Sequence, residues 1–215
     1  MNAMKLQDLH YMGYAREARV TGHACAVYRP VDPLSPLAGD PVATLPACFN
    51  VGGSYKKPNS YGAALWQAVL DGRLTRPGDV LVRQSDGAVW FIAAQQHLLP
   101  IMAIACNSTV AITRPVSTAG AVGAMSYGAS VAATDQVVAA GWPASLLLIG
   151  KGATNRVGLP DDVLEVNFTA LLPPSLDCDL QESDMLTDTD QRRYIVQAVE
   201  HTALGWRLLV KRAQT

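Results

Sequence analysis

The chain has few charged side chains and no excess of either sign. Only 16% of its 215 residues are charged, and the formal net charge at pH 7 is -1. Proteins that bind nucleic acids or membrane surfaces concentrate positive charge, so we expect neither sequence-specific nucleic acid nor a membrane as a partner. With 49% hydrophobic residues, however, the chain can bury a core, which excludes wholesale disorder.

Long apolar runs and a secretory signal are also missing. Charged residues such as Lys5, Asp8 and Arg16 interrupt the start of the chain. The longest apolar stretch, residues 137–150, is too short to span a bilayer and contains Pro143. We therefore expect synthesis in the cytoplasm of the cell.

Cysteine and histidine lack the spacing of a metal site. None of the four cysteines forms a CxxC pair, and the four histidines lie far apart: Cys25, Cys48, Cys106, Cys178, His10, His23, His97 and His201. Zinc ligands usually come in close pairs, and disulfides are rare in a reducing compartment. We expect four reduced, metal-free thiols and no cofactor.

The catalytic motifs that occur are incomplete. Residues 54–57 match S-x-x-K without the other elements that such serine enzymes need. Residues 124–128 resemble a nucleophile elbow but lack the strand before it and the helix after it. We assign no catalytic residue and expect no enzyme. A small hydrolase that uses Ser126 or His97 is the alternative.

The pattern of elements predicts a mainly β fold. It consists of small β-barrel or sandwich units, with an N-terminal helix that ends at Gly22 and a short second helix from Tyr61 to Leu70. Short apolar runs between turn residues predict strands at 24–28, 79–83, 89–94, 101–106, 110–113, 145–149, 163–172, 194–199 and 206–211.

This pattern divides the chain into five parts. They are a helix and strand (1–29), a proline-rich arm and loop (30–60), a first β unit (61–115), a neutral loop rich in Ala, Gly and Ser (116–143) and a second β unit (144–215).

A weak internal repeat links the two β units. Asp79 begins a strand, an aromatic strand follows, and His97 comes 18 residues after the aspartate; Asp184 and His201 repeat this order with a spacing of 17 residues. Any two β-meanders can look this similar, so the residues leave open whether the units are related.

Two segments have the composition of contact surfaces. Residues 30–46 contain five prolines with apolar residues between them, which suits an extended arm that docks on a surface, either of its own domain or of a neighbour. Between Asp86 and Lys151 the only charges are Arg114 and Asp135, which favours a subunit interface over a neutral loop. The candidate interface residues are Leu34, Leu37, Ala124, Tyr127 and Ala129.

One acidic run stands apart from these segments. Residues 177–190 hold six acidic residues and no basic one. We interpret the run as a solvated face, with a charged docking patch as the alternative.

Several short segments together resemble virion proteins of tailed bacteriophages. They are Tyr14-Ala15-Arg16-Glu17-Ala18-Arg19, Tyr28-Arg29-Pro30, Pro77-Gly78-Asp79-Val80-Leu81, Trp90-Phe91-Ile92-Ala93-Ala94-Gln95-Gln96, Leu99-Pro100-Ile101, Arg193-Tyr194-Ile195-Val196 and Leu204-Gly205-Trp206-Arg207. The order of Pro-Gly-Asp, strand, turn and aromatic strand is similar to the small β-barrel proteins that join head and tail. The N-terminal helix and the proline-rich arm depart from a minimal joining barrel.

The resemblance implies a structural subunit at the head–tail connector, neck or tail, present in the virion and made in the cytoplasm of a bacterial host. Its implied partners are copies of itself in a ring and other virion proteins, such as portal or adaptor, tail-tube or fibre proteins. A tail fibre or baseplate adaptor is a further alternative.

Overall fold

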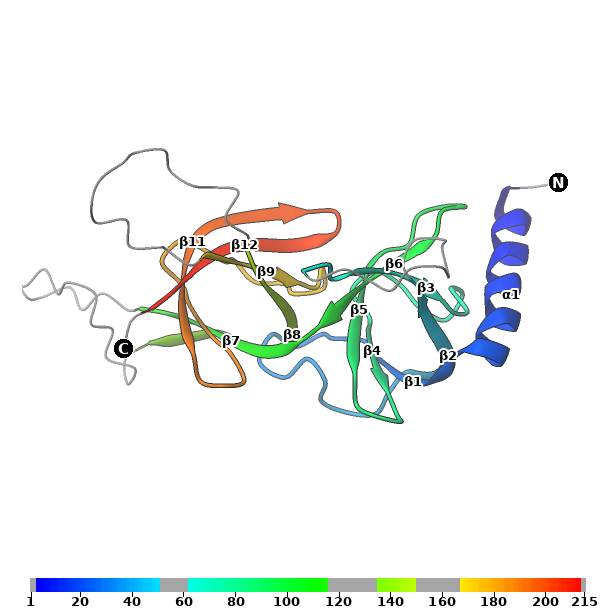
Figure 1. Ribbon diagram of the computed structural model, residues 1–215, viewed down its shortest axis with the longest axis horizontal. Coiled ribbons are helices and arrows are strands. Elements are labelled where there is room, and N and C mark those ends of the chain that lie inside the picture. Colours follow the sequence, from blue (N-terminus) through cyan, green and yellow to red (C-terminus); the bar gives the residue numbers. More distant parts are fainter. Residues whose placement is uncertain (1–2, 51–61, 116–134, 150–166, 214–215) are drawn as a thin grey trace, which may run out of the picture.

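An N-terminal helix and two closed β-barrels, arranged along one long axis, make up the protein (Figure 1). The computed structural model describes residues 3–50, 62–115, 135–149 and 167–213. The predicted fold class, a mainly β protein with two barrel units after an N-terminal helix, is confirmed.

The helix α1 (Ala3–Thr21) covers one end of the first barrel. Tyr11 is buried there, and its hydroxyl accepts a hydrogen bond from Gln95 Nε2 at 3.2 Å. The helix ends as predicted at Gly22, whose amide donates to Ala18 O at 2.8 Å. A Cβ at Gly22 would come within 2.8 Å of the Ala47 backbone, so only glycine allows the helix end to lie this close to the barrel.

The first barrel closes in the order β1-β2-β3-β6-β5-β4. Its strands are β1 (His23–Tyr28), β2 (Ala43–Asn50), β3 (Leu65–Val69), β4 (Val80–Arg83), β5 (Val89–Ala94) and β6 (Ile101–Cys106).

The second barrel closes in the order β7-β8-β9-β12-β11-β10. Its strands are β7 (Ser108–Arg114), β8 (Gln136–Leu148), β9 (Asn167–Leu172), β10 (Met185–Thr187), β11 (Arg193–Thr202) and β12 (Gly205–Arg212). Adding six to each strand number of the first barrel gives the order of the second, so the two barrels have one topology.

The pairing registers place the two copies residue by residue. Cys25 pairs with Leu45 as Val110 pairs with Trp142. The next pairs match as well, and each brings a proline into the strand: Ala24 with Pro46, and Thr109 with Pro143. The internal repeat that the residues left open is therefore a property of the fold.

Matching positions fill the two interiors. The first barrel encloses Cys25, Val27, Leu45, Ala47, Ala68, Leu70, Leu81, Trp90, Ile92, Ile101 and Ala103. The second encloses Val110, Ile112, Trp142, Ala144, Ala170, Leu172, Leu186, Tyr194, Val196, Leu208 and Val210. Some matching positions differ in size, such as Cys25 and Leu45 in the first barrel and Val110 and Trp142 in the second, and both barrels keep the same topology.

A third apolar cluster joins the barrels. The outer sides of β4, β5 and β6 contribute Val80, Phe91 and Ile104, and Leu147 and Leu171 of the second barrel pack against this group. The chain passes from β6 to β7 through the single residue 107. Such a short linker and a shared core fix the orientation of the two barrels.

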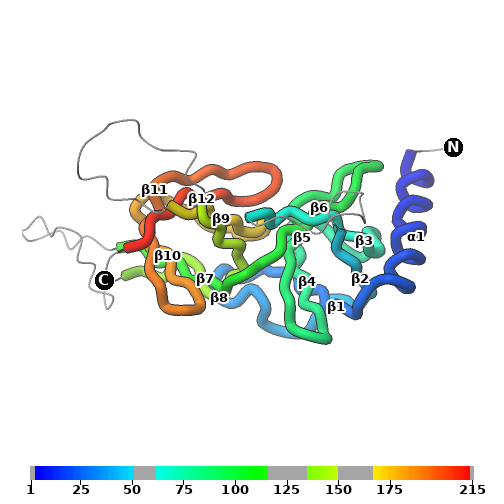
Figure 2. Tube along the Cα trace, in the orientation of Figure 1, coloured from blue at the N-terminus to red at the C-terminus, as the bar shows by residue number. Residues whose placement is uncertain are grey.

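The arm between β1 and β2 reaches across this junction (Figure 2). Pro33 O accepts hydrogen bonds from Ala140 N at 2.9 Å and from Trp142 Nε1 at 2.7 Å, both on β8. Pro36 is buried against the same strand, 3.5 Å from the position of a Cβ at Gly141. The arm therefore packs partly on its own chain.

Three predicted elements differ from the structure. The predicted second helix is wrong, because Leu65–Val69 forms strand β3 and Trp66, Ala68 and Leu70 face the barrel core. The predicted arm ends too late, because β2 already begins at Ala43 and includes Pro46. The predicted neutral loop ends too late as well, because β8 begins at Gln136.

Candidate functional site

An arginine and a buried aspartate fasten the first barrel. Arg29 follows β1, and its Nε and Nη2 donate to the Asp79 carboxylate at 2.9 and 2.8 Å. Arg76 N donates to the same carboxylate at 3.0 Å. The Asp79 side chain is 1% exposed, so these donors replace the water that the charge has lost.

The second barrel repeats this clamp. Arg114 at the end of β7 donates from Nε and Nη2 to Asp184 at 2.8 and 3.0 Å, and Gln181 N donates at 2.8 Å. The residue before each aspartate has a positive φ, 89° at Gly78 and 72° at Ser183. The two Arg–Asp pairs are thus part of the duplicated framework, and each ties the first strand of its barrel to the fourth.

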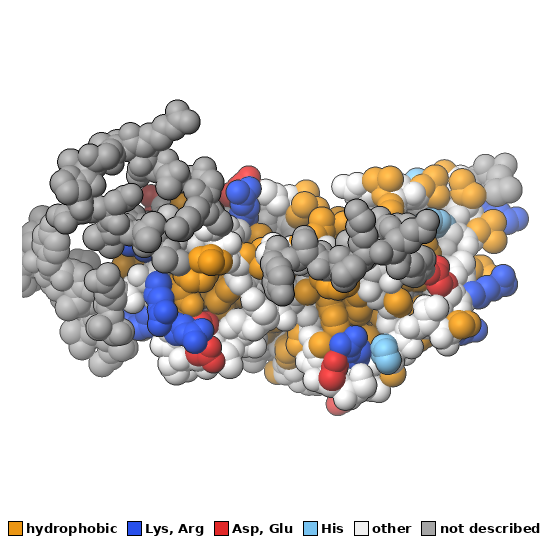
Figure 3. Space-filling view, in the orientation of Figure 1, with side chains coloured by type: hydrophobic (Ala, Val, Ile, Leu, Met, Phe, Trp, Pro, Cys, Tyr) orange, Lys and Arg blue, Asp and Glu red, His pale blue; other side chains and the backbone are white. Residues whose placement is uncertain are grey.

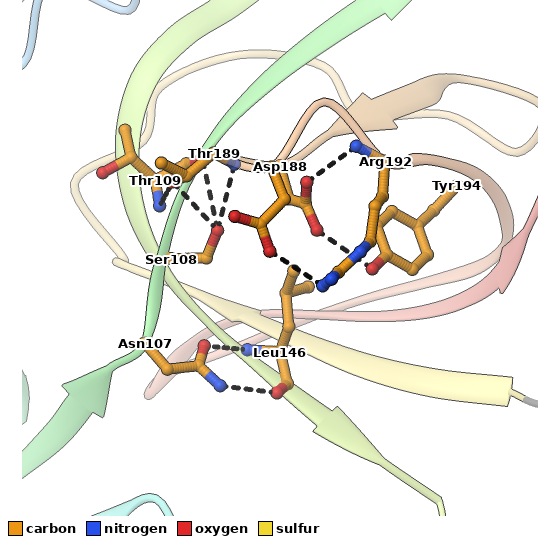
Figure 4. A network of polar contacts seen from close by, with 9 residues as sticks. Asn107, Ser108, Thr109, Leu146, Asp188, Thr189, Arg192 and Tyr194 are labelled. Atoms are coloured by element: carbon orange, nitrogen blue, oxygen red, sulfur yellow. Dashed lines mark hydrogen bonds and ion pairs between the residues drawn. The ribbon is translucent and has the colours of Figure 1, made fainter.

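A polar network holds the linker between the barrels (Figure 4). Asn107 Nδ2 donates to Leu146 O at 2.8 Å, and Leu146 N donates to Asn107 Oδ1 at 2.8 Å. The amide side chain thereby pairs with β8 as a strand backbone does. This pairing adds a polar constraint to the apolar junction.

The same network fastens the turn between β10 and β11. Thr189 Oγ1 accepts from Thr109 N at 2.9 Å, and Asp188 accepts from Arg192 N at 2.8 Å and from Tyr194 Oη at 3.0 Å. Burial raises the pKa of Tyr194, and the hydrogen bond to Asp188 raises it further. The phenol therefore stays protonated and acts as a donor.

The acidic run was predicted to be a solvated face, and this is only partly right. Asp177, Asp179 and Glu182 are exposed, whereas Asp184 and Asp188 are buried and hydrogen-bonded. The buried members stabilise turns, which removes them from a surface patch.

The helix α1 exposes large apolar side chains on the face that points away from the barrel. The helix buries Gln7, Tyr11, Ala15 and Ala18. The exposed residues on the opposite side include Leu6 (44% exposed), Leu9 (48%), Met12 (37%) and Val20 (86%). Surface helices normally turn the apolar side inward, so the outward face of α1 is unusually apolar for a solvent-exposed face.

Basic side chains lie beside this apolar face (Figure 3). Lys5 and Arg16 are both exposed, and neither has an ion-pair partner among the described residues. The helix also carries Arg19 and the acidic residues Asp8 and Glu17. The helix end of the molecule therefore combines apolar side chains with a small excess of positive charge.

The arm forms a second apolar surface, of opposite charge. Val31 and Val42 are 88% and 53% exposed, and Leu34 is 52% exposed. Asp32 and Asp40 are exposed, and residues 30–42 contain no basic residue. Hydrogen bonds from the Ser35 hydroxyl and the Leu34 amide lower the pKa of Asp32, so it stays ionised near neutral pH.

The predicted interface residues fall into two groups. Leu34 is exposed, whereas Leu37 packs against the cluster between the barrels. Ala124, Tyr127 and Ala129 lie outside the described residues, as does Ser126 of the alternative hydrolase, and these assignments stay predictions. His97 of the alternative hydrolase is exposed, and the histidine at the matching place in the repeat, His201, stacks on Trp206 with ring centroids 4.2 Å apart.

Sequence reasoning missed the two Arg–Asp clamps and the outward face of α1. A sequence pattern could have indicated the clamps, because each arginine precedes a proline at the end of a predicted strand, in Arg29-Pro30 and Arg114-Pro115. The outward face of α1 was partly indicated by the spacing of Leu6, Leu9, Gly13 and Val20, which places these residues on one side of a helix.

Comparison with protein families, with curated proteins and with solved structures finds no match to this chain. Within the described residues, no helix is long and apolar enough to cross a membrane, and no group of three or more His, Cys, Asp or Glu side chains is placed to bind a metal ion.

Proposed function

We propose that the protein is a structural subunit of a tailed-phage virion, which forms or joins a ring at the head–tail connector, neck or tail. The observation that carries this proposal is a duplicated, internally braced barrel that exposes apolar side chains on two separate surfaces, α1 and the arm. Exposed apolar patches of this kind are typical of protein–protein contacts.

The geometry suits a ring because the two surfaces differ. A contact between unlike surfaces is heterologous, and repeated heterologous contacts close into rings when the rotation allows it. The clamps and the one-residue linker hold the two surfaces at a fixed distance and angle, as a ring of defined size requires. The resemblance of short sequence segments to small joining barrels supports the proposed location in the virion.

The direct test is the composition of purified particles from a phage whose genome encodes the chain. We expect quantitative mass spectrometry to find the chain in several copies per particle, at a ratio to the portal protein that fits a ring. A chain that is produced during infection but is missing from washed particles would contradict the proposal.

A further inference from the structure

We propose that the outward face of α1 binds the proline-rich arm of a second copy of the chain, with the basic residues Lys5 and Arg16 set against the acidic residues Asp32 and Asp40. This inference rests on the proposed ring. It names the two surfaces that meet in the ring and the charges that fix their orientation.

The contact inside the chain shows which surface is left for a neighbour. In the junction, β5 and β6 of the first barrel pack against β8, and Leu171 of β9 joins the same cluster. The corresponding strands of the first barrel are β2 and β3, and α1 covers them. A neighbouring copy therefore cannot repeat the junction there and meets the outer face of α1 instead.

The outer face of α1 is shaped for a close contact. Leu6, Leu9, Gly13 and Val20 follow one another along one side of the helix. A Cβ at Gly13 would meet nothing within 4 Å, so the fold of this chain does not require a glycine at that position. Glycine within a helix is less stable than alanine, which favours a role for Gly13 in letting a partner backbone approach.

Charge selects the arm as the partner surface. The outer face of the second barrel occupies the position that makes the junction in the first barrel, but it carries Arg193 and Lys211. Neither residue offers a charge opposite to Lys5 and Arg16, and Arg193 itself pairs with Asp135 at 3.7 Å. The arm instead offers apolar residues between two carboxylates, which matches α1 in both polarity and charge.

The positions of the two surfaces agree with a contact between copies. α1 lies at one end of the molecule, and the arm lies beside the barrel junction (Figure 2). The arm is also held in shape before it binds, because Pro33 and Pro36 fasten it to β8 and Asp32 closes its first turn. A fixed arm loses little conformational entropy on binding.

A charge exchange tests the contact. Arg16→Glu and Asp40→Arg each place like charges opposite one another, and both positions are exposed, so both variants should keep the thermal stability of the wild type. In sedimentation velocity over a concentration series, we expect each to weaken self-association about tenfold or more. The double variant, and an equimolar mixture of the two single variants, should associate again because the opposite charges are restored.

Glu182→Arg is the matched control, since Glu182 is exposed on the second barrel outside both surfaces; we expect it to associate as the wild type does. The inference is overturned if the wild type stays monomeric at every concentration, if either single variant associates normally, or if the double variant fails to recover. A chain that is found in particles but fails the exchange keeps the proposed function and loses this contact. A chain that passes the exchange but is missing from particles keeps the contact and loses the function.

Discussion

Removal of the arginine from each Arg–Asp clamp should destabilise the fold by different amounts in the two barrels. Among the described residues, Arg114→Met leaves the Asp184 carboxylate, 1% exposed, with no ion-pair partner and with Gln181 N as its remaining donor. Breaking a buried pair in this way costs about 3–5 kcal/mol. Arg29→Met leaves Asp79 with a second arginine, because Arg76 Nε lies 3.7 Å away and is 58% exposed. Such a pair recovers about 1 kcal/mol or less, so Arg29→Met should cost less than Arg114→Met by about that amount.

Urea unfolding, followed by tryptophan fluorescence and circular dichroism, measures these free energies. Arg207→Met is the control, because the Arg207–Glu200 pair is 3.3 Å long and its side chains are 64% and 56% exposed. We expect the control to stay within about 0.5 kcal/mol of the wild type. An Arg114→Met variant as stable as the control would refute the reasoning that the clamps brace the barrels.

Three further outcomes follow from the structure. Burial raises the pKa of Cys106 to about 12, so a thiol reagent at pH 8 should label Cys106 only after the protein unfolds. Mass spectrometry without reductant should find all four cysteines as free, metal-free thiols. A disulfide or a bound metal ion would contradict this expectation. The hydrogen bond from Arg83 and, after it, the hydrogen bond from the Ala88 amide lower the pKa of Asp86 to about 2. The stabilisation from the Asp86 charge is therefore present above about pH 4 and is lost as the pH falls through about 2. An NMR titration should show the midpoint of Asp86 rise in Arg83→Gln, and an unchanged midpoint would refute the cause. Leu37→Ser should lower the free energy of unfolding of the monomer by about 1–2 kcal/mol, because Leu37 packs against the cluster between the barrels. Leu34→Ser should leave the stability unchanged, because Leu34 is exposed. Equal losses of stability for the two variants in thermal melts would show that the whole arm is structural.

The strands that begin after Pro77 were predictable because local signals agree there. Asp86-Gly87 forms a turn between two apolar runs, and Gly87 has a φ of 72°, as a tight hairpin requires. The repeat could also be seen from Asp79 and Asp184, since each begins its strand after a turn residue with positive φ.

The strands β2 and β3 were missed because their local signals conflict with their place in the barrel. Pro46 was assigned to the extended arm because proline cannot donate to a ladder, but β3 joins β2 only from Cys48 onward, so the proline lies where β2 has a neighbour on one side. Alanine, leucine and glutamine between Tyr61 and Leu70 favour a helix, and the barrel core overrides that preference.

The orientation of α1 was not predictable from its apolar spacing. The small and apolar residues of the helix include Ala15, Ala18, Leu6, Leu9 and Val20, but of these only the alanines face the barrel. Gly22 allows the end of the helix to lie close to β2. At this short distance, alanine side chains fit between the helix and the barrel, whereas leucine side chains do not. The choice between the two faces depends on this distance, which no local pattern encodes.

A reconstruction of the purified phage particle by electron cryomicroscopy tests the central claim most directly. We predict a closed ring at the head–tail connector, neck or tail, in which each subunit has two lobes of barrel size and one helix against its neighbour. A particle with every ring assigned to other proteins, or with this chain as a single copy outside any ring, would contradict the account.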